Sequence, residues 1–204
     1  MPKISDQYRD ERRAHILAAA RRCFLRDGFH ETSMQDLVNE AGVSSGAVYR
    51  YFAGKDAVIV AIAEENLDEV VAIVRVSAQR RDSLGEALAA ALEFLSARHT
   101  EDGFGAIALL VWAEALRNPA LAARLRKSFD EAAASLTEIA PSGGSMGLDA
   151  EALVNVLLCV IPGYLMQTTI RGADATKTVI GAVGTLWPGG EGAGRRQDPA
   201  PRSQ

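Results

Sequence analysis

Hydrogen-bonding side chains crowd into one stretch near the N-terminus, ETSMQDLVNEAGVSSGAVYRYFAGKD, between Glu31 and Asp56. Hydroxyl side chains come first, then Tyr49, Arg50 and Tyr51 in succession, and then Lys55. Phenol, guanidinium and ammonium groups donate hydrogen bonds to phosphate oxygens, and arginine also reads the edge of guanine. The stretch therefore has the chemistry needed to hold nucleic acid.

Two short helices must position these groups. The pattern predicts one helix from about Ser33 to Glu40 and a second from about Ser45 to Phe52, because Ala41-Gly42-Val43 and Ala53-Gly54 interrupt the helical periodicity. Gly42 is able to take the left-handed conformation that a tight turn requires. Two short helices joined by such a turn describe a helix-turn-helix.

A capping box is expected at the start of the first short helix. Two pairs fit the spacing, Thr32 with Gln35 and Ser33 with Asp36.

The periodicity also divides these helices into an inner and an outer side. Leu37, Val43 and Val48 are expected to point inward, covered by Leu17 and Phe24 from a preceding helix at about 10–27 that ends at Gly28. The outward side chains are then Ser45, Gly46, Ala47, Tyr49 and Arg50. Ordinary packing is the competing interpretation of the aromatic residues. We adopt it for Phe52 and Val48, and we expect Tyr49, Tyr51 and Lys55 to contact nucleic acid.

The string T-S-x-x-D-L-x-x-E-A-G-V-S-x-G-A-V-Y-R-Y-F-x-x-K-D, at 32–56, resembles the DNA-binding signature of the tetracycline-repressor (TetR) family, and the resemblance extends over about residues 10–60. It implies a homodimeric transcriptional regulator that binds a pseudo-palindromic operator in double-stranded DNA. A repressor released by a small-molecule effector is the default of that family.

The resemblance also implies roles for individual residues. Thr32 and Ser33 would contact a phosphate through hydroxyl or backbone N–H, and Tyr49 and Tyr51 would donate to phosphates. Lys55 would fix the start of the next helix to the DNA backbone. At the start of the second short helix, the residues near backbone and bases would be Ser44, Ser45, Gly46 and Ala47, with Ala47 against a thymine methyl. Relatives often carry Lys where this chain has Ser45 and His where it has Arg50, so whether Arg50 reads a base or holds a phosphate stays open.

The remainder of the chain is predicted to be helical as well. A long helix from about Lys55 to Gln79 is followed by five more, which gives about nine helices, no sheet and an all-α fold. Acidic residues on the outer side of the long helix, Glu64, Glu65, Asp68 and Glu69, are expected to be solvated. We expect a DNA-binding domain at 1–54, a ligand-binding and dimerisation domain at 55–188, and a disordered tail rich in Gly and Pro at 189–204.

The second predicted domain should contain the effector pocket and the dimer interface. Few charged residues fall on its apolar helix faces, which favours an apolar or aromatic effector. The segment from Leu153 to Leu165 is apolar nearly all round, so it needs cover on more than one side. The resemblance implies that the last two helices supply this cover by pairing with their copies. The candidate pocket residues are Phe94, His99, Phe104, Trp112, Phe129, Asn155, Tyr164 and Gln167.

Composition bounds the class of protein. The chain is 48% hydrophobic and 24% charged, as expected for a globular protein, and its net charge is −4. Residues 1–56 hold nine Lys+Arg against eight Asp+Glu, and the remainder thirteen against eighteen, so the N-terminal part is the better suited to phosphate.

There is no signal-peptide pattern and no apolar run of the roughly 18 residues that span a membrane, so we expect a cytoplasmic protein. Cys23 and Cys159 lie in apolar helical stretches and are predicted to be buried, reduced thiols.

Other functions find less support. His15, His30 and His99 are scattered, and no metal-ligand spacing, nucleophile motif or phosphate loop occurs. We therefore predict no catalysis, no metal and no cofactor. Two alternatives stay open: a helical protein-interaction module that binds no DNA, and a ligand-dependent activator or co-repressor of the same family.

Overall fold

The computed structural model describes residues 6–80, 84–139 and 150–186, and within these ranges the chain forms nine α-helices and no strand. The predicted all-α fold is confirmed, while the predicted tail at 189–204 lies outside the described residues. The helices are α1 (Asp6–Glu31), α2 (Met34–Ala41), α3 (Ser45–Tyr51), α4 (Lys55–Arg80), α5 (Leu84–Asp102), α6 (Phe104–Ala115), α7 (Pro119–Ile139), α8 (Ala150–Arg171) and α9 (Ala173–Leu186).

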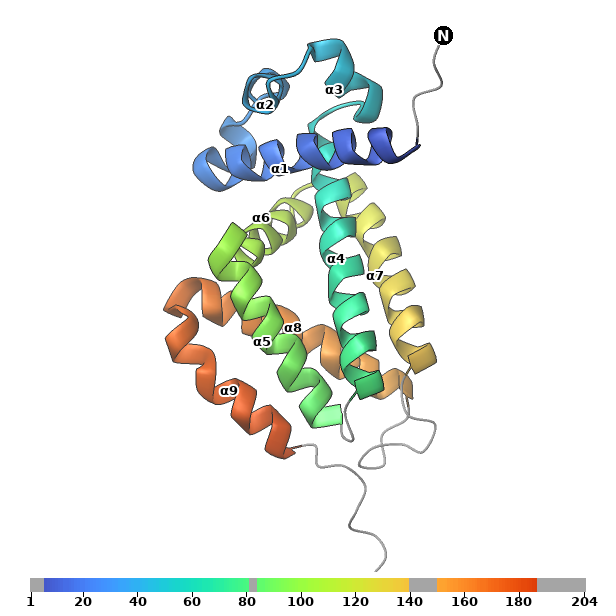
Figure 1. The fold of residues 1–204 in the computed structure, drawn as a ribbon, viewed down its shortest axis with the longest axis vertical. Coiled ribbons are helices and arrows are strands. Elements are labelled where there is room, and N and C mark those ends of the chain that lie inside the picture. The colour runs from blue at the N-terminus through green and yellow to red at the C-terminus, as the bar shows by residue number, and fades with distance from the viewer. Residues whose placement is uncertain (1–5, 81–83, 140–149, 187–204) are drawn as a thin grey trace, which may run out of the picture.

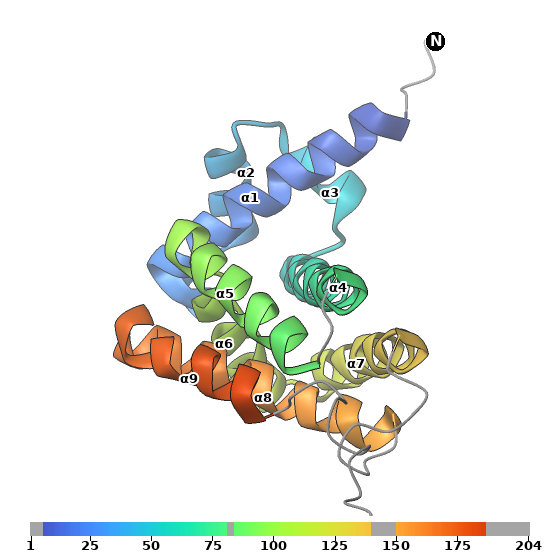
Figure 2. The ribbon, with the colours of Figure 1, turned by 60° about the horizontal axis from the view of Figure 1, so that its bottom comes forward.

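Helix α1 lies across one end of the molecule, with α2 and α3 on its outer side (Figure 1). Below α1, the long helices α4 and α7 run side by side, and α5 packs between α4 and α9. Figure 2 shows α8 and α9 along the opposite edge, with no described helix outside them. The short helices α2 and α3 are therefore presented at one end, while α8 and α9 form an outer layer.

Two apolar clusters form the core. The first joins Leu17 and Phe24 of α1 to Leu37 of α2 and Val48 of α3, as the periodicity predicts, and it continues without a break into α4, α6 and α7. The second lies among α4, α5, α6, α8 and α9. Trp112 packs against both clusters. The end that carries α2 and α3 is thus continuous with the rest of the molecule through shared apolar packing.

Local signals fix the helix ends near α2. Ser33 and Asp36 form the capping box: the Asp36 N–H donates to Ser33 Oγ at 3.2 Å, and the Ser33 N–H donates to Asp36 Oδ2 at 2.8 Å. The alternative pairing of Thr32 with Gln35 is wrong. Gly42 takes φ +61° in the turn to α3, a conformation that side chains disfavour. These hydrogen bonds hold the pKa of the Asp36 carboxyl below its ordinary value.

The acidic side of α4 differs from its prediction. Glu64 and Asp68 are exposed, as expected for a solvated face. Glu65, however, pairs with Arg13 at 2.7 Å and Arg21 at 3.2 Å. Glu69 pairs with Arg98 at 2.8 Å. Their arginine partners lie on α1 and α5, at separations along the chain that the periodicity of α4 alone does not reveal.

The two cysteines have different environments. Cys23 is buried as predicted, and burial raises the pKa of its thiol. The prediction for Cys159 is wrong, because this residue lies on the exposed side of α8. Among the described residues, no helix is both long and apolar enough to cross a membrane.

Replacing Ser33 with Ala removes the two hydrogen bonds of its hydroxyl group, from the Asp36 N–H and to Asp36 Oδ2, while the bond from the Ser33 N–H stays. The free energy of unfolding should fall by about 1 kcal/mol at neutral pH. The Asp36 carboxylate contributes fully above its unfolded-state pKa, and the contribution is lost as the pH falls through the lower folded-state pKa. Urea unfolding followed by circular dichroism, at several values between about pH 7 and about pH 3, should therefore show the difference from wild type shrinking in acid. A pH-independent difference would contradict the assignment.

Candidate nucleic-acid interface and internal cavity

Helix α3 presents its polar side chains outward, as the periodicity predicts. Tyr49 is 51% exposed, and the neighbouring Arg50 is exposed as well. Ser45 and Gly46 are exposed and Ala47 is half-buried at the N-terminal end of the helix. On the inner side, Val48 is fully buried and Phe52 is 3% exposed, so the core assignment of these two is confirmed. The inner side of α3 thus packs on the apolar core through Val48 and Phe52, and its outer side presents small and polar residues at the molecular surface.

Three hydroxyl groups around α2 and α3 already have hydrogen-bond partners within the chain. Ser44 caps α3, and its Oγ accepts the Ala47 N–H at 3.3 Å. The exposed Ser33 hydroxyl donates to Asp36 Oδ2 at 2.6 Å in the capping box. Thr32 is 1% exposed and its Oγ1 donates to the Gly28 carbonyl at 2.7 Å. The expected phosphate contact through the Thr32 hydroxyl is therefore wrong, and only the expectation for its backbone N–H is left.

Tyr51 lies where α3 meets α1. It is half-buried, its ring is 6.4 Å from that of Phe52, and it shares a surface hollow with Arg9, Asp10 and Arg13. The Arg13 guanidinium also lies 5.8 Å above the Phe52 ring. The end of α3 is thus held against the N-terminal half of α1.

Lys55 has a different position from the one the resemblance implies. Its ammonium group turns inward and donates to the carbonyl oxygens of Phe29 and Thr32, the second at 3.0 Å. These carbonyls belong to the segment from the kink of α1 at Gly28 to the start of α2, which we call the α1–α2 turn. In the chain without DNA the ammonium group of Lys55 therefore does not face outward, and its contact to a DNA phosphate stays a prediction. The lysine instead fastens the first turn of α4 to the α1–α2 turn.

A second link joins α1 and α4 about three turns further along. Arg21 of α1 donates to Asn66 Oδ1 at 2.8 Å and to Glu65 Oε2 at 3.2 Å. Arg13 donates to the other carboxylate oxygen of Glu65 at 2.7 Å. One carboxylate and one amide of α4 therefore hold two arginines of α1, and one of these arginines reaches the end of α3.

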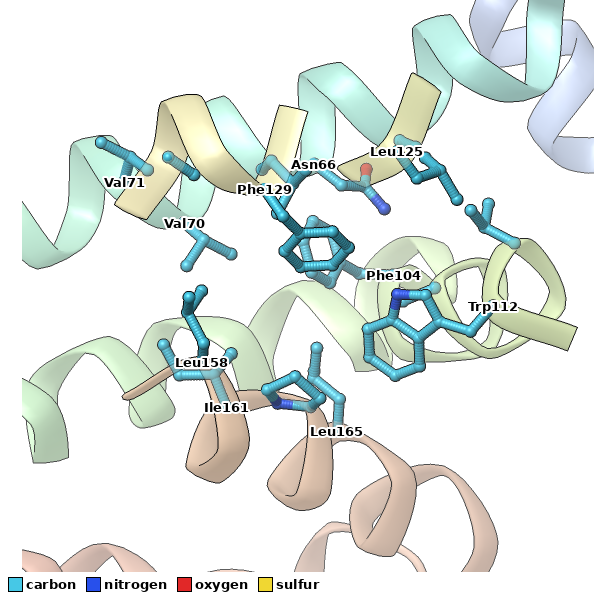
Figure 3. Close-up of a pocket in the computed structure, with 16 residues that line it drawn as sticks. Asn66, Val70, Val71, Phe104, Trp112, Leu125, Phe129, Leu158, Ile161 and Leu165 are labelled. Atoms are coloured by element: carbon cyan, nitrogen blue, oxygen red, sulfur yellow. The ribbon is translucent and has the colours of Figure 1, made fainter. Parts of the chain in front are cut away.

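A cavity of about 60 Å³ lies inside the bundle, bounded by α4, α6, α7 and α8 (Figure 3). Its wall is almost wholly apolar. The lining residues are Ala63, Asn66, Leu67, Val70, Val71, Phe104, Ala108, Val111, Trp112, Leu125, Phe129, Ala132, Leu158, Ile161, Pro162 and Leu165. Such a wall suits an apolar or aromatic molecule. Among the described residues, no group of three or more His, Cys, Asp or Glu comes together as a candidate metal site.

Three of the eight predicted pocket residues line this cavity, namely Phe104, Trp112 and Phe129. Phe94 is 38% exposed and Asn155 is exposed, because other residues of α5 and α8 take the inner positions. For these two the predicted place in the pocket is wrong.

The remaining three candidates lie near the core but not on the cavity wall. Gln167 is half-buried and accepts a hydrogen bond from Arg171 at 3.2 Å. Tyr164 is buried in the second cluster. His99 is half-buried, and its Nδ1 lies close to Gly105 and has no hydrogen-bond partner. None of the three lines this cavity, and their role in binding an effector stays a prediction.

Asn66 is a cavity residue that was not predicted from the sequence. This residue is 6% exposed and lines the cavity from α4. A signal was present, because position 66 falls between Ile62 and Val70 on the apolar stripe of α4. A single polar residue on an inner stripe indicates a buried hydrogen-bonding role.

Residues 16–62 match the family model described as "Bacterial regulatory proteins, tetR family". The HTH-type transcriptional regulator YfiR of Bacillus subtilis is 44% identical over 68 residues, which cover 33% of this chain and 33% of YfiR. The HTH-type transcriptional repressor Rv1474c of Mycobacterium tuberculosis is 37% identical over 73 residues, which cover 36% of this chain and 39% of that protein. The match thus spans about a third of YfiR and 39% of Rv1474c. Relatives named as repressors and a relative named as an activator are both among the matches.

The fold extends the likeness over most of the chain. The solved structure of Salmonella enterica GusR superposes with a TM-score of 0.65 and 26% identity, and it covers 90% of this chain and 100% of its own.

Replacing Lys55 with Met keeps the aliphatic stem and removes the ammonium group from two backbone carbonyls. The free energy of unfolding should fall by about 1–3 kcal/mol, because hydrogen bonds to a charged donor are lost and their acceptors are left in a half-buried place. Urea unfolding of the purified chain, without DNA, measures this.

The matched control is Arg50→Met, which removes an exposed cation of α3 and should change stability by less than about 0.5 kcal/mol. Equal stability of Lys55→Met and wild type would show that the lysine does not brace α4.

Proposed function

Since the chain belongs to the tetR family of bacterial regulatory proteins, we propose that it is a DNA-binding transcriptional regulator, a repressor that a small-molecule effector releases from its operator. The observation that carries the proposal is α3 itself: Tyr49 and Arg50 stand exposed on a helix whose other side is locked into the core through Val48. A short helix supported in this way inserts into the major groove without losing its shape. Such a regulator acts in the cytoplasm, where bacterial DNA lies, and the proposal includes no catalytic step.

The proposed DNA-binding domain spans residues 1–54, and α3 is its recognition helix. Small residues at the start of α3, Ser45 and Gly46, allow close approach of the backbone to the DNA. Tyr49 and Tyr51 would donate to phosphates, and Arg50 would contact a phosphate or a guanine. Ser33 and Ser44 stand at the N-termini of α2 and α3, where backbone N–H groups favour a phosphate.

A homodimer would present two such helices. Residues 55–188 would form the ligand-binding and dimerisation domain, with α8 and α9 at the interface. The support is a set of exposed apolar side chains on the outer side of these helices, Cys159, Met166, Ile170 and Val179. Ile170 is 73% exposed, an unusual state for isoleucine unless a partner covers it. In a symmetric dimer the same patch meets its own copy.

Release by an effector would act through α4. The cavity of about 60 Å³ is small beside the roughly 300–1,000 Å³ of sites for drug-sized ligands, so a ligand of that size must separate its walls. Helix α4 forms one wall and is fastened to α1 by Lys55, Glu65 and Asn66. A shift of α4 therefore carries α1, and α3 with it. Recognition helices that leave the spacing of about 34–36 Å between successive major grooves bind the operator less well.

The sign of regulation is the finer part of the proposal. A ligand-dependent activator, or a co-repressor that needs its ligand to bind, uses the same structural elements with the opposite preference of the ligand. A promoter fusion to a reporter gene, with and without the chain, tests the repressor assignment. Expression that rises when the chain is deleted supports repression, and expression that falls supports activation.

DNA binding by α3 is tested with Tyr49→Phe and Arg50→Ala, alone and together, on the DNA upstream of the chain's own gene. Each change should weaken binding. If Arg50 holds a phosphate, its loss should lower the slope of log affinity against log salt by about 1, whereas loss of the uncharged Tyr49 hydroxyl should leave the slope unchanged. Fluorescence anisotropy at several salt concentrations measures both. If Arg50 reads a guanine, the loss should concentrate on the operator, whereas a phosphate contact should weaken binding to all DNA. Affinity unchanged in the double variant would refute the interface.

The dimer interface is tested with Ile170→Glu, which places a charge on the outer side of α8. The variant should sediment as a monomer at concentrations where wild type is a dimer, because a charge buried in an apolar interface is strongly unfavourable. Leu116→Glu is the matched control: Leu116 is 88% exposed at the end of α6, outside α8 and α9, and its variant should stay dimeric. Sedimentation velocity of wild type and the two variants measures their oligomeric states. Dimers of Ile170→Glu would place the interface elsewhere.

A further inference from the structure

The cavity contains one side chain that packing does not explain. Asn66 is 6% exposed, and its Nδ2 is buried without a hydrogen-bond partner. Only Trp112, among the other residues that line the cavity, carries a polar side-chain atom. A buried amide donor without an acceptor is unfavourable beside a leucine of similar shape. Oδ1 of Asn66 is accounted for by Arg21, but the free donor Nδ2 on an otherwise apolar wall indicates a group that hydrogen-bonds to something in the cavity.

Arg21 sets the orientation of the Asn66 amide. Arg21 has only donors, so the Asn66 atom that meets it at 2.8 Å must be the acceptor Oδ1. The N–H donors of Nδ2 must then lie on the other side. Figure 3 shows the amide nitrogen of Asn66 directed into the space between Phe129 and Trp112, and the indole nitrogen of Trp112 on the side of its ring that faces Asn66. Both polar groups at this place are therefore donors.

We propose that Asn66 is the residue with which the cavity recognises its effector, an apolar molecule that carries one uncharged acceptor oxygen, such as a ketone or an ester. Asn66 Nδ2 donates to that oxygen, and the indole N–H of Trp112 is the second donor beside it. The remaining apolar wall covers the hydrocarbon part. This inference rests on the proposed function only in taking the cavity as the effector site.

The chemistry of the site argues against a charged effector. No charged side chain lines the cavity. The nearest cation, Arg21, already serves Asn66 and the carboxylate of Glu65. A carboxylate or an ammonium group in the cavity would lose its hydration without gaining an opposite charge. A group that can only donate would find no side-chain acceptor on the wall, because Oδ1 of Asn66 is occupied by Arg21.

A matched pair of probes isolates the acceptor oxygen. Heptanophenone and heptylbenzene have the same ring and chain length and differ in one carbonyl in place of a methylene. The full-length chain should bind the ketone about 3- to 10-fold more tightly than the hydrocarbon, the ratio that one net hydrogen bond supplies. Isothermal titration calorimetry measures the ratio. Equal affinities, or no binding of either probe by wild type, would overturn the proposal.

Asn66→Asp is the informative variant, because it keeps the shape and the acceptor for Arg21 but replaces the donor toward the cavity with an acceptor. The ketone should lose its advantage and bind no better than the hydrocarbon. Asn66→Leu, which removes both polar atoms, should also abolish the preference and serves if the charged variant does not fold. Phe129→Leu is the control: it should weaken both probes and leave their ratio unchanged. A ketone preference retained in both Asn66 variants would assign the recognition to another group.

A measurement without any variant gives a second readout. In the ¹⁵N-labelled wild-type chain, the side-chain amide resonances of Asn66 should shift when the ketone is added and stay largely in place with the hydrocarbon. DNA affinity, measured without probe, separates this inference from the proposed function. A chain that binds its operator but shows no ketone preference refutes only the role of Asn66. One that shows the preference but binds no DNA refutes only the regulator.

Discussion

The hydrogen bonds of Arg21 set how the two ends of this molecule are related. The guanidinium leaves α1 and donates to both Asn66 and Glu65, two successive residues of α4. Its side chain is 16% exposed, so these bonds form in a partly desolvated place where charge-assisted hydrogen bonds are strong. Asn66 also lines the cavity. Arg21 therefore joins the cavity wall to α1, the helix on which α2 and α3 rest.

Helix α4 is attached to α1 at two separate points along its length. Lys55 holds the first turn of α4 to the carbonyls of the α1–α2 turn, and Glu65 holds Arg13 about three turns later. A helix bound at two separated points moves with its partner, since a change in the angle between them would break charge-assisted bonds at one point or the other. Under the proposed function, a displacement of this cavity wall would therefore carry α1 with it. This is a physical route for coupling between sites, and it requires no change within α3.

Features that depend on neighbours along the chain were predictable from sequence. The inner stripe of α1, a capping box at the start of α2 and the turn at Gly42 follow from spacing and backbone preference, and all are present. Side chains that meet distant partners were not predictable. Lys55 carries the same type of charge whether it faces a phosphate or a carbonyl. Only the fold brings the carbonyls of Phe29 and Thr32 within its reach.

The residues that line the cavity were also only partly predictable from the sequence. Aromatic and polar residues of the later helices were sensible candidates, but their helical phase decides their place: Phe94 and Asn155 face outward, while the plain aliphatic residues Leu158 and Ile161 line the wall. Helix α8 is apolar on nearly every side. Its inner face lines the cavity, and its outer face carries Cys159, Met166 and Ile170. Residue types alone do not assign its faces. A dimer that covered the outer face of α8 would hold this wall of the cavity in place, so that α4 would yield first to an entering molecule.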